Sequence, residues 1–157
     1  MYQLVPELVP RPLFGRSVYR SVPRSIWDRR IRQTVFDRAK GTCEDCGAAY
    51  EKRMVCHEVW EYRDQDHVAL LVGFKLICQD CNFVHHLGKA STLDRGDAAI
   101  QHMIRVNRIP EEEARELASR AFDTWLQRSL IREWTIAISA QLQKEFPFLS
   151  DVPFRAA

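Results

Sequence analysis

The chain has 157 residues, of which 46% are hydrophobic, so it can bury a core as one domain, or as one domain with helical extensions. The formal net charge of +2 is too small to indicate a partner by itself, and no run of about 18 apolar residues predicts a membrane span. The N-terminus lacks the pattern of a secretory signal. The five cysteines are therefore interpreted as metal ligands rather than disulfides, and the protein is expected in the cytoplasm.

Positive charge is concentrated at the start of the chain. Residues 1–40 carry nine Arg/Lys against three Asp/Glu, whereas residues 41–93 carry five against eight and residues 94–157 nine against ten. A basic arm beside an acidic middle is consistent with a phosphate-binding surface next to a metal site. An ordinary solvated surface is the simpler interpretation of charge alone.

The N-terminal quarter predicts an arm followed by a helix. Residues 1–24 contain four prolines and scattered arginines, which indicates an extended segment that wraps another surface or stays mobile. Ser25 is a candidate N-cap for a helix over about 25–40, and Gly41 suits its end. The apolar stripe of this helix has i, i+4, i+8 spacing: Trp27, Ile31 and Val35.

Residues 41–93 predict a β-hairpin followed by a short helix. The two apolar stretches run from Met54 to Tyr62 and from His67 to Ile77, and the polar residues 63–66 join them. A short helix is expected from about Asp80 to about Gly88. The region therefore has the order strand, strand, helix.

Residues 94–145 predict helices throughout. Ile100, Met103 and Ile104 share one face, and Pro110 suits the start of the next helix. That helix has a long amphipathic stripe: Ala114, Leu117, Ala118, Ala121, Phe122, Trp125 and Leu126. A last helix is expected from the spacing of four further residues: Leu130, Trp134, Ile138 and Leu142.

Two CxxC pairs predict a structural zinc ion. Cys43 and Cys46 form the first pair, and Cys78 and Cys81 form the second; 31 residues separate the two pairs. Two residues between thiolates let both sulfurs reach one ion from a single turn, so two such knuckles complete a tetrahedral site with four thiolate ligands. Every position is then filled by protein, so the ion stabilises the fold and takes no part in a reaction.

A second group of residues is a candidate active centre. His57 lies in the first predicted strand, and Asn82 and His86 share one face of the following helix at i, i+4 spacing. His85 is the alternative to His86. His102 lies beside Met103 in a later helix, where a surface or core role is the more natural interpretation.

These residues resemble the HNH nuclease family (the His-Me finger), in the subclass framed by two CxxC knuckles. The resemblance covers roughly residues 20–140 and is most specific in three runs, which match small bacterial and phage HNH proteins: Val55-Cys56-His57-Glu58-Val59-Trp60-Glu61-Tyr62, Leu71-Val72-Gly73-Phe74 and Cys78-Gln79-Asp80-Cys81-Asn82. It implies an α+β fold with a ββα-metal core. It also implies an endonuclease that hydrolyses phosphodiester bonds, with double-stranded DNA as the expected partner.

The resemblance also implies roles for individual residues. His57 is the general base on water, and Cys56, Asn82 and His86 are the positions of ligands to a second divalent cation, Mg²⁺, Mn²⁺, Ni²⁺ or Zn²⁺. The chain departs from the family pattern at Cys56, where Asp or His is usual, and at Gly73, where the family has an Asn. A zinc-stapled module that binds nucleic acid or a protein without cleaving it is therefore the alternative function.

The expected architecture has three consecutive parts: a basic arm (1–24), a zinc-stapled ββα domain that includes the N-terminal helix (25–93), and a bundle of three helices (94–157). The bundle is a candidate surface for a protein partner or for self-association. Four arginines near the start of the N-terminal helix are candidate phosphate contacts: Arg24, Arg29, Arg30 and Arg32.

Overall fold

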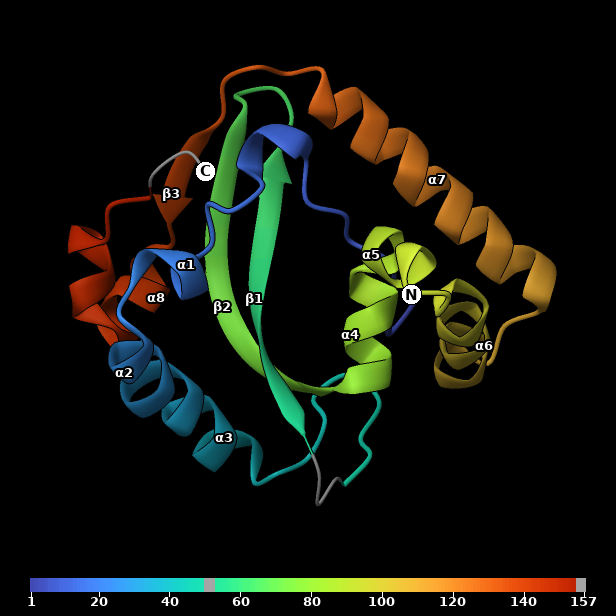
Figure 1. The fold of residues 1–157 in the computed structure, drawn as a ribbon, viewed down its shortest axis with the longest axis horizontal. Helices are drawn as coiled ribbons and strands as arrows, with labels where there is room; N and C mark the ends of the chain where they lie inside the picture. Colours follow the sequence, from blue (N-terminus) through green and yellow to red (C-terminus); the bar gives the residue numbers. More distant parts are fainter. Residues whose placement is uncertain (50–52, 155–157) are drawn as a thin grey trace. The chain divides into compact units, whose positions relative to one another are not determined.

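The computed structural model describes residues 1–49 and 53–154 (Figure 1). The chain divides into two compact units. The first unit comprises Met1–Val9, Gly41–Val55 and Leu76–Gln127. The second unit comprises Pro10–Lys40, Cys56–Lys75 and Arg128–Ala157. Each unit combines segments that are far apart in the sequence. The consecutive division into arm, ββα domain and helical extension stays a prediction.

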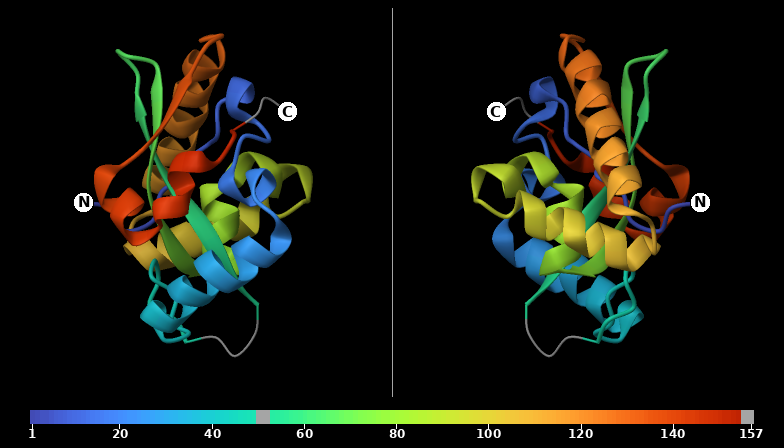
Figure 2. Two further views of the ribbon diagram at one scale, coloured as in Figure 1. Left: turned by 90° about the vertical axis from the view of Figure 1, so that its left-hand side faces the viewer. Right: turned by 90° about the vertical axis from the view of Figure 1, so that its right-hand side faces the viewer.

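Three helices form the centre of the first unit: α4 (Gln79–His85), α5 (Leu87–Thr92) and α6 (Gly96–Asn107). They pack against one another, as Figure 2 shows from two sides. The side chains buried in these helices are mainly apolar and include Val84, Leu87, Ala90, Ile100 and Met103. The predicted apolar face of α6 is thereby confirmed at Ile100 and Met103.

Helix α7 (Glu111–Ser129) follows directly after Pro110, as the sequence predicts. Ala114 and Ala118 are buried on its apolar stripe, whereas Leu126 at the far end of the stripe is exposed. Within the described residues, every helix is too short or too polar to cross a membrane.

Residues 2–9, the first part of the expected arm, bind to the helices of the first unit. Asn107, at the end of α6, accepts hydrogen bonds at Oδ1 from the backbone N–H groups of Gln3 (2.8 Å) and Leu4 (2.9 Å). Its Nδ2 donates to the backbone oxygen of Leu4 at 2.6 Å. Leu4 is completely buried. This part of the arm therefore wraps the protein's own helices.

Replacing Asn107 with Ala should lower the free energy of unfolding by about 2 kcal/mol, because the part-buried backbone N–H and oxygen of Leu4 lose their partner. Urea denaturation measures the change. Gln101→Ala, at an exposed position of the same helix, is the matched control. Equal stability of the two variants would show that the Asn107 contacts contribute nothing.

The second unit is built on a three-stranded sheet with the order β1-β2-β3. Strands β1 (Met54–Arg63) and β2 (Val68–Cys78) form a hairpin, and both match the predicted strands to within one residue at each end. The outer ends of the two strands, residues 54–55 and 76–78, belong to the first unit. The hairpin thus connects the two units along the chain.

Strand β3 (Thr135–Ile138) corrects the last helix predicted from the sequence. It pairs in parallel with β2, in a register that runs from Val68↔Thr135 to Leu71↔Ile138. Three of its four residues, TIAI, are β-branched and favour a strand once β2 offers a hydrogen-bonding edge. Helix α8 (Ala140–Glu145) begins only after Ser139. The expected bundle of three helices is therefore wrong in this region.

The N-terminal helix forms as predicted, although its internal geometry differs. It runs through α2 (Arg24–Ile26), a π-helical segment η2 (Trp27–Arg32) and α3 (Gln33–Ala39). Its apolar stripe is buried: Trp27, Ile31 and Val35. Pro23 rather than Ser25 is the N-cap, and Gly41 follows the end of the helix with a left-handed φ of 67°.

Two short helices, η1 (Arg11–Leu13) and α1 (Val18–Ser21), interrupt the part of the arm that lies in the second unit. Glu58 of β1 binds the start of α1. Its Oε1 accepts from the backbone N–H of Tyr19 at 2.9 Å, and its Oε2 accepts from Trp60 Nε1 at 3.1 Å. The carboxylate therefore holds α1 against β1.

Burial raises the pKa of Glu58 in the folded chain, although its hydrogen bonds act in the opposite direction. Between the ordinary carboxyl pKa of about 4.3 and this raised value, the folded chain binds the proton more tightly than the unfolded chain. Stability should therefore fall as the pH rises through that window. Glu58→Gln cannot ionise, so the wild type should lose stability relative to this variant between pH 4 and pH 7.

Thermal or urea unfolding across this pH range tests the prediction, with Glu61→Gln on the same strand as the control. Parallel pH profiles for the wild type and Glu58→Gln would contradict it.

Candidate metal centre

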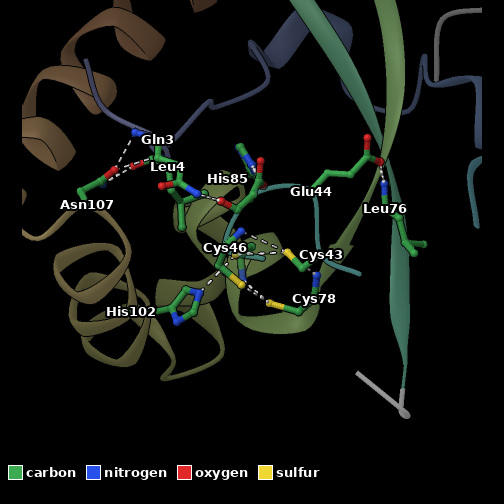
Figure 3. A network of polar contacts seen from close by, with 12 residues as sticks. Gln3, Leu4, Cys43, Glu44, Cys46, Leu76, Cys78, His85, His102 and Asn107 are labelled. Atoms are coloured by element: carbon green, nitrogen blue, oxygen red, sulfur yellow. Dashed lines mark hydrogen bonds and ion pairs between the residues drawn. The ribbon is translucent and has the colours of Figure 1, made fainter. Parts of the chain in front are cut away.

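The four cysteines of the two CxxC pairs converge in the first unit (Figure 3). Their sulfur atoms all lie within 4.8 Å of one another, and they form a group that could hold a metal ion. Cys78 is the N-cap of α4, and Cys81 lies in the first turn of this helix. The predicted convergence of both pairs on one point is confirmed.

The first pair lies in a tight turn. The backbone N–H of Gly47 donates to the oxygen of Cys43 at 2.9 Å, and that of Cys43 donates to the oxygen of Ala48 at 2.9 Å. Gly47 has a left-handed φ of 76°, which a residue with a side chain adopts at a cost. Glycine at this position therefore lets the chain fold back between Cys46 and Ala48.

Glu44 joins this turn to the end of β2. Its backbone N–H donates to the oxygen of Leu76 at 2.8 Å, and its Oε2 accepts from the N–H of Leu76 at 2.6 Å. Leu76 lies two residues before Cys78. These two hydrogen bonds therefore place the second cysteine pair opposite the first.

The distances between the sulfur atoms fit an ion that is coordinated tetrahedrally. A tetrahedron with sulfur about 2.3 Å from a central zinc has edges of about 3.8 Å. The Sγ atoms of Cys43 and Cys81 are 3.8 Å apart, and those of Cys46 and Cys78 are also 3.8 Å apart. Three of the four cysteines are buried, and Cys46 is half-buried. The group therefore has the dimensions and the enclosure of a structural Cys₄ site.

The electrostatics of the cluster also favour a cation. Contacts with Cys78 and Cys81, together with the backbone N–H groups of Cys46 and Cys78, lower the pKa of the Cys43 thiol. The contact with Cys43 in turn raises the pKa of Cys78 to about 12 and also raises the pKa of Cys81. Four thiolates this close repel one another, and a divalent ion at their centre offsets that repulsion.

A buried polar pair holds the first turn against α4. His85 Nε2 and Asp45 Oδ2 are 2.6 Å apart, and their side chains are only 6% and 4% exposed. The segment 2–9 reaches the same pair, because Gln3 Nε2 donates to the backbone oxygen of Asp45 and the N–H of Glu7 donates to that of His85. His85, the alternative ligand of the active centre, thus contacts the cysteine turn.

Asn82 and His86 occupy adjacent turns, as their spacing predicts. The backbone N–H of His86 donates to the oxygen of Asn82 at 3.0 Å, although His86 is the C-cap of α4 and has non-helical dihedrals. Burial lowers the pKa of His86 to about 4, so its imidazole is neutral near pH 7, which is the form that binds metals.

Cys56 and His57 are both buried on β1, within the second unit. Adjacent residues of a strand point to opposite faces, so the two side chains cannot share one face of β1. The grouping of His57 with Asn82 and His86 in one active centre stays a prediction.

Sequence reasoning did not connect His102 with the cysteines. In the structure its Nε2 lies 3.2 Å from the Sγ of Cys81 (Figure 3). Burial lowers the pKa of His102. No spacing rule links residues 81 and 102, because they meet only through the packing of α4 on α6.

The four candidate phosphate-binding residues are exposed in the second unit: Arg24, Arg29, Arg30 and Arg32. Arg24 forms an ion pair with Asp28 at 3.0 Å, one helical turn away. The guanidinium of Arg30 lies 4.5 Å from the ring centre of Phe148. These two contacts orient the side chains without burying their charges.

Comparison with known proteins does not extend this description: no family model matches the chain, and neither curated proteins nor solved structures yielded a match.

We expect the wild-type chain to retain one zinc ion through gel filtration and the double variant Cys43→Ser/Cys78→Ser to lose it, since each CxxC pair then keeps a single thiolate. Elemental analysis counts the ions. Stripping the metal with a strong chelator should lower the midpoint of thermal unfolding, because the cysteine pairs lose their common partner.

Cys56→Ser, which removes the fifth cysteine, is the matched control. Equal zinc content in the double variant and in this control would contradict the Cys₄ site.

Proposed function

We propose that this protein is a metal-dependent endonuclease of the HNH type that hydrolyses phosphodiester bonds in DNA, with a structural zinc ion in the Cys₄ centre. The observation that carries the proposal is the convergence of four sulfurs at the start of α4, the helix of a strand–strand–helix segment. Cys81 directly precedes Asn82, so an ion bound to the cysteines also restrains the helix turn that carries Asn82, one of the proposed ligands.

The proposed hydrolysis uses a general base and a second divalent cation. His57 accepts the proton of the attacking water, the role of a general base, for which the neutral form of the imidazole is required. Asn82, through its amide oxygen, and His86, through a neutral imidazole nitrogen, would hold a second divalent cation. When bound, that cation supplies Lewis-acid stabilisation of the charge that develops on the phosphate and the leaving oxygen.

The charge of the second unit supports a nucleic-acid partner. Its first segment, residues 10–40, carries nine Arg/Lys against two Asp/Glu. Arg29 and Arg32 are exposed on the N-terminal helix, away from its buried stripe. Phosphate contacts of this kind position a nucleic acid without reading its sequence. His57 belongs to the same unit.

Two positions favour the alternative, a module that binds nucleic acid without cleaving it. Cys56 stands where the family has Asp or His, and a thiolate suits Zn²⁺ better than Mg²⁺. Gly73 stands where the family has Asn, and it offers no side chain to orient His57. A side chain at Gly73 would meet no atom within 4 Å, so bulk does not account for the glycine.

Nicking of supercoiled plasmid in a series of Mg²⁺, Mn²⁺, Ni²⁺ and Zn²⁺ separates the two functions. We expect cleavage with at least one of these ions, and His57→Ala should reduce its rate by a factor of about 10²–10⁴, the usual contribution of a general base. Retention of the structural zinc in His57→Ala shows that the fold is intact.

His67→Asn is the control variant, because Asn tolerates the left-handed backbone at this hairpin position, where φ is 54°. Duplex binding without cleavage under any of the four ions would favour the binding module. Cleavage that survives in His57→Ala would rule out His57 as the base.

A further inference from the structure

His102 brings a polar side chain to the cysteine cluster from a separate helix. It lies in the second turn of α6, and its Nε2 is 3.2 Å from the Sγ of Cys81 in α4 (Figure 3). The residue is half-buried, so the ring fills space between α6 and the cluster while part of it stays accessible.

When a metal ion is bound at the cysteines, the chemistry of the thiolate decides which atom of this contact is the hydrogen-bond donor. A thiolate bound to a metal has no proton, so it can only accept a hydrogen bond. The proton must therefore be on Nε2 of His102. A donor facing an ionised acceptor forms a charge-assisted hydrogen bond, which is stronger than a neutral one.

The contact complements the backbone hydrogen bonds of the cluster. The N–H groups of Cys46 and Cys78 point to the sulfur of Cys43, at 3.5 and 3.3 Å, and the N–H of Cys81 points to the sulfur of Cys78 at 3.5 Å. The contacts donated by Cys46 and Cys81 lie within a CxxC turn, whereas the contact donated by Cys78 joins the two pairs. The sulfur of Cys81 receives its donor from a side chain that is 21 residues away.

We propose that His102 is a positioning residue of the metal centre: through Nε2–H it hydrogen-bonds the metal-bound thiolate of Cys81, and it thereby helps to retain the ion and attaches α6 to the cluster. The inference rests on the metal-filled Cys₄ centre proposed above, and it is independent of nuclease activity.

The consequence is a less reactive thiolate. Four thiolates and one divalent cation carry a net charge of −2, and each hydrogen bond to sulfur spreads part of that charge onto the protein. Partners of this kind around metal ligands typically contribute about 10–100-fold to metal affinity. Without the donor, Cys81 should be the first ligand to dissociate or to react with an electrophile.

Two amide substitutions test the contact, because only one of them has a side chain long enough to place an N–H against the sulfur of Cys81. The side-chain nitrogen of His102→Gln takes the place of Nε2 and retains an N–H toward Cys81, whereas the amide of His102→Asn ends one bond short. Gln101→Asn makes the same kind of change at the exposed neighbouring position of α6 and controls for helix propensity.

The first readout is the rate at which a chromogenic chelator removes zinc from the purified full chain at a fixed pH. We expect release to be about 10–100-fold faster from His102→Asn than from the wild type, with His102→Gln and Gln101→Asn near the wild-type rate.

The second readout is the absorption spectrum of the Co²⁺-substituted chain. The sulfur-to-cobalt charge-transfer band should move to lower energy in His102→Asn, because a hydrogen bond lowers the energy of the sulfur lone pair. A purely structural role of His102 would leave this band unchanged.

Equal release rates and identical charge-transfer bands in the wild type and His102→Asn would overturn the role of His102 while leaving the metal centre intact. A wild-type chain that takes up neither Zn²⁺ nor Co²⁺ would overturn the metal centre and this inference together. Loss of plasmid nicking alone bears on neither.

Discussion

The convergence of four cysteine sulfurs is the constraint on which the first unit depends. Cys43 and Cys46 lie in a turn with little apolar surface of its own, and Cys78 and Cys81 lie at the junction of β2 and α4. Sulfur–sulfur separations of 3.8 Å are the edges of a zinc-sized tetrahedron. Because four such thiolates repel one another, an ion at their centre would convert a repulsive arrangement into the strongest link between the turn and the helix.

Polar contacts around the cluster make this arrangement specific. Glu44 joins the turn to β2, Asp45 joins it to His85 of α4, and His102 contacts Cys81 from α6. Asn107, one helical turn beyond Met103 in α6, binds the segment 2–9, which also reaches Asp45. Each of these side chains has a hydrogen-bond partner in an element far away in the sequence. The cysteine turn, β2, α4, α6 and the segment 2–9 therefore restrain one another.

The second unit is organised by apolar and aromatic packing. The ring of Trp27 on the N-terminal helix meets Phe74 of β2 edge-on at 5.9 Å, and Phe74 meets Phe146 at 5.6 Å. These contacts hold the basic helix to the sheet while its arginines stay exposed. Burial of Glu58 at the start of α1 adds a carboxylate whose ionisation opposes folding near neutral pH. The unit thus combines a basic surface with the strand that carries His57.

Local patterns in the sequence determined most of the elements and the four cysteines that could hold a metal ion. Two apolar stretches joined by the polar residues 63–66 predict the hairpin. The stripe of Trp27, Ile31 and Val35 predicts the N-terminal helix, and the CxxC spacing predicts the Cys₄ group. These features depend on residues that are neighbours along the chain or on one turn, so their periodicity and spacing carry the information.

Only the tertiary structure decided the features that need a distant partner. Residues 135–138 have spacing compatible with a helix, yet they form β3 because β2 presents an edge to them. His102 looks like a surface or core residue until α6 packs on α4 and brings it to Cys81. Asn107 and Asp45 likewise acquire their partners from segments more than 35 residues away. Such contacts depend on which elements pack together, and the local periodicity of the sequence carries no information about that packing.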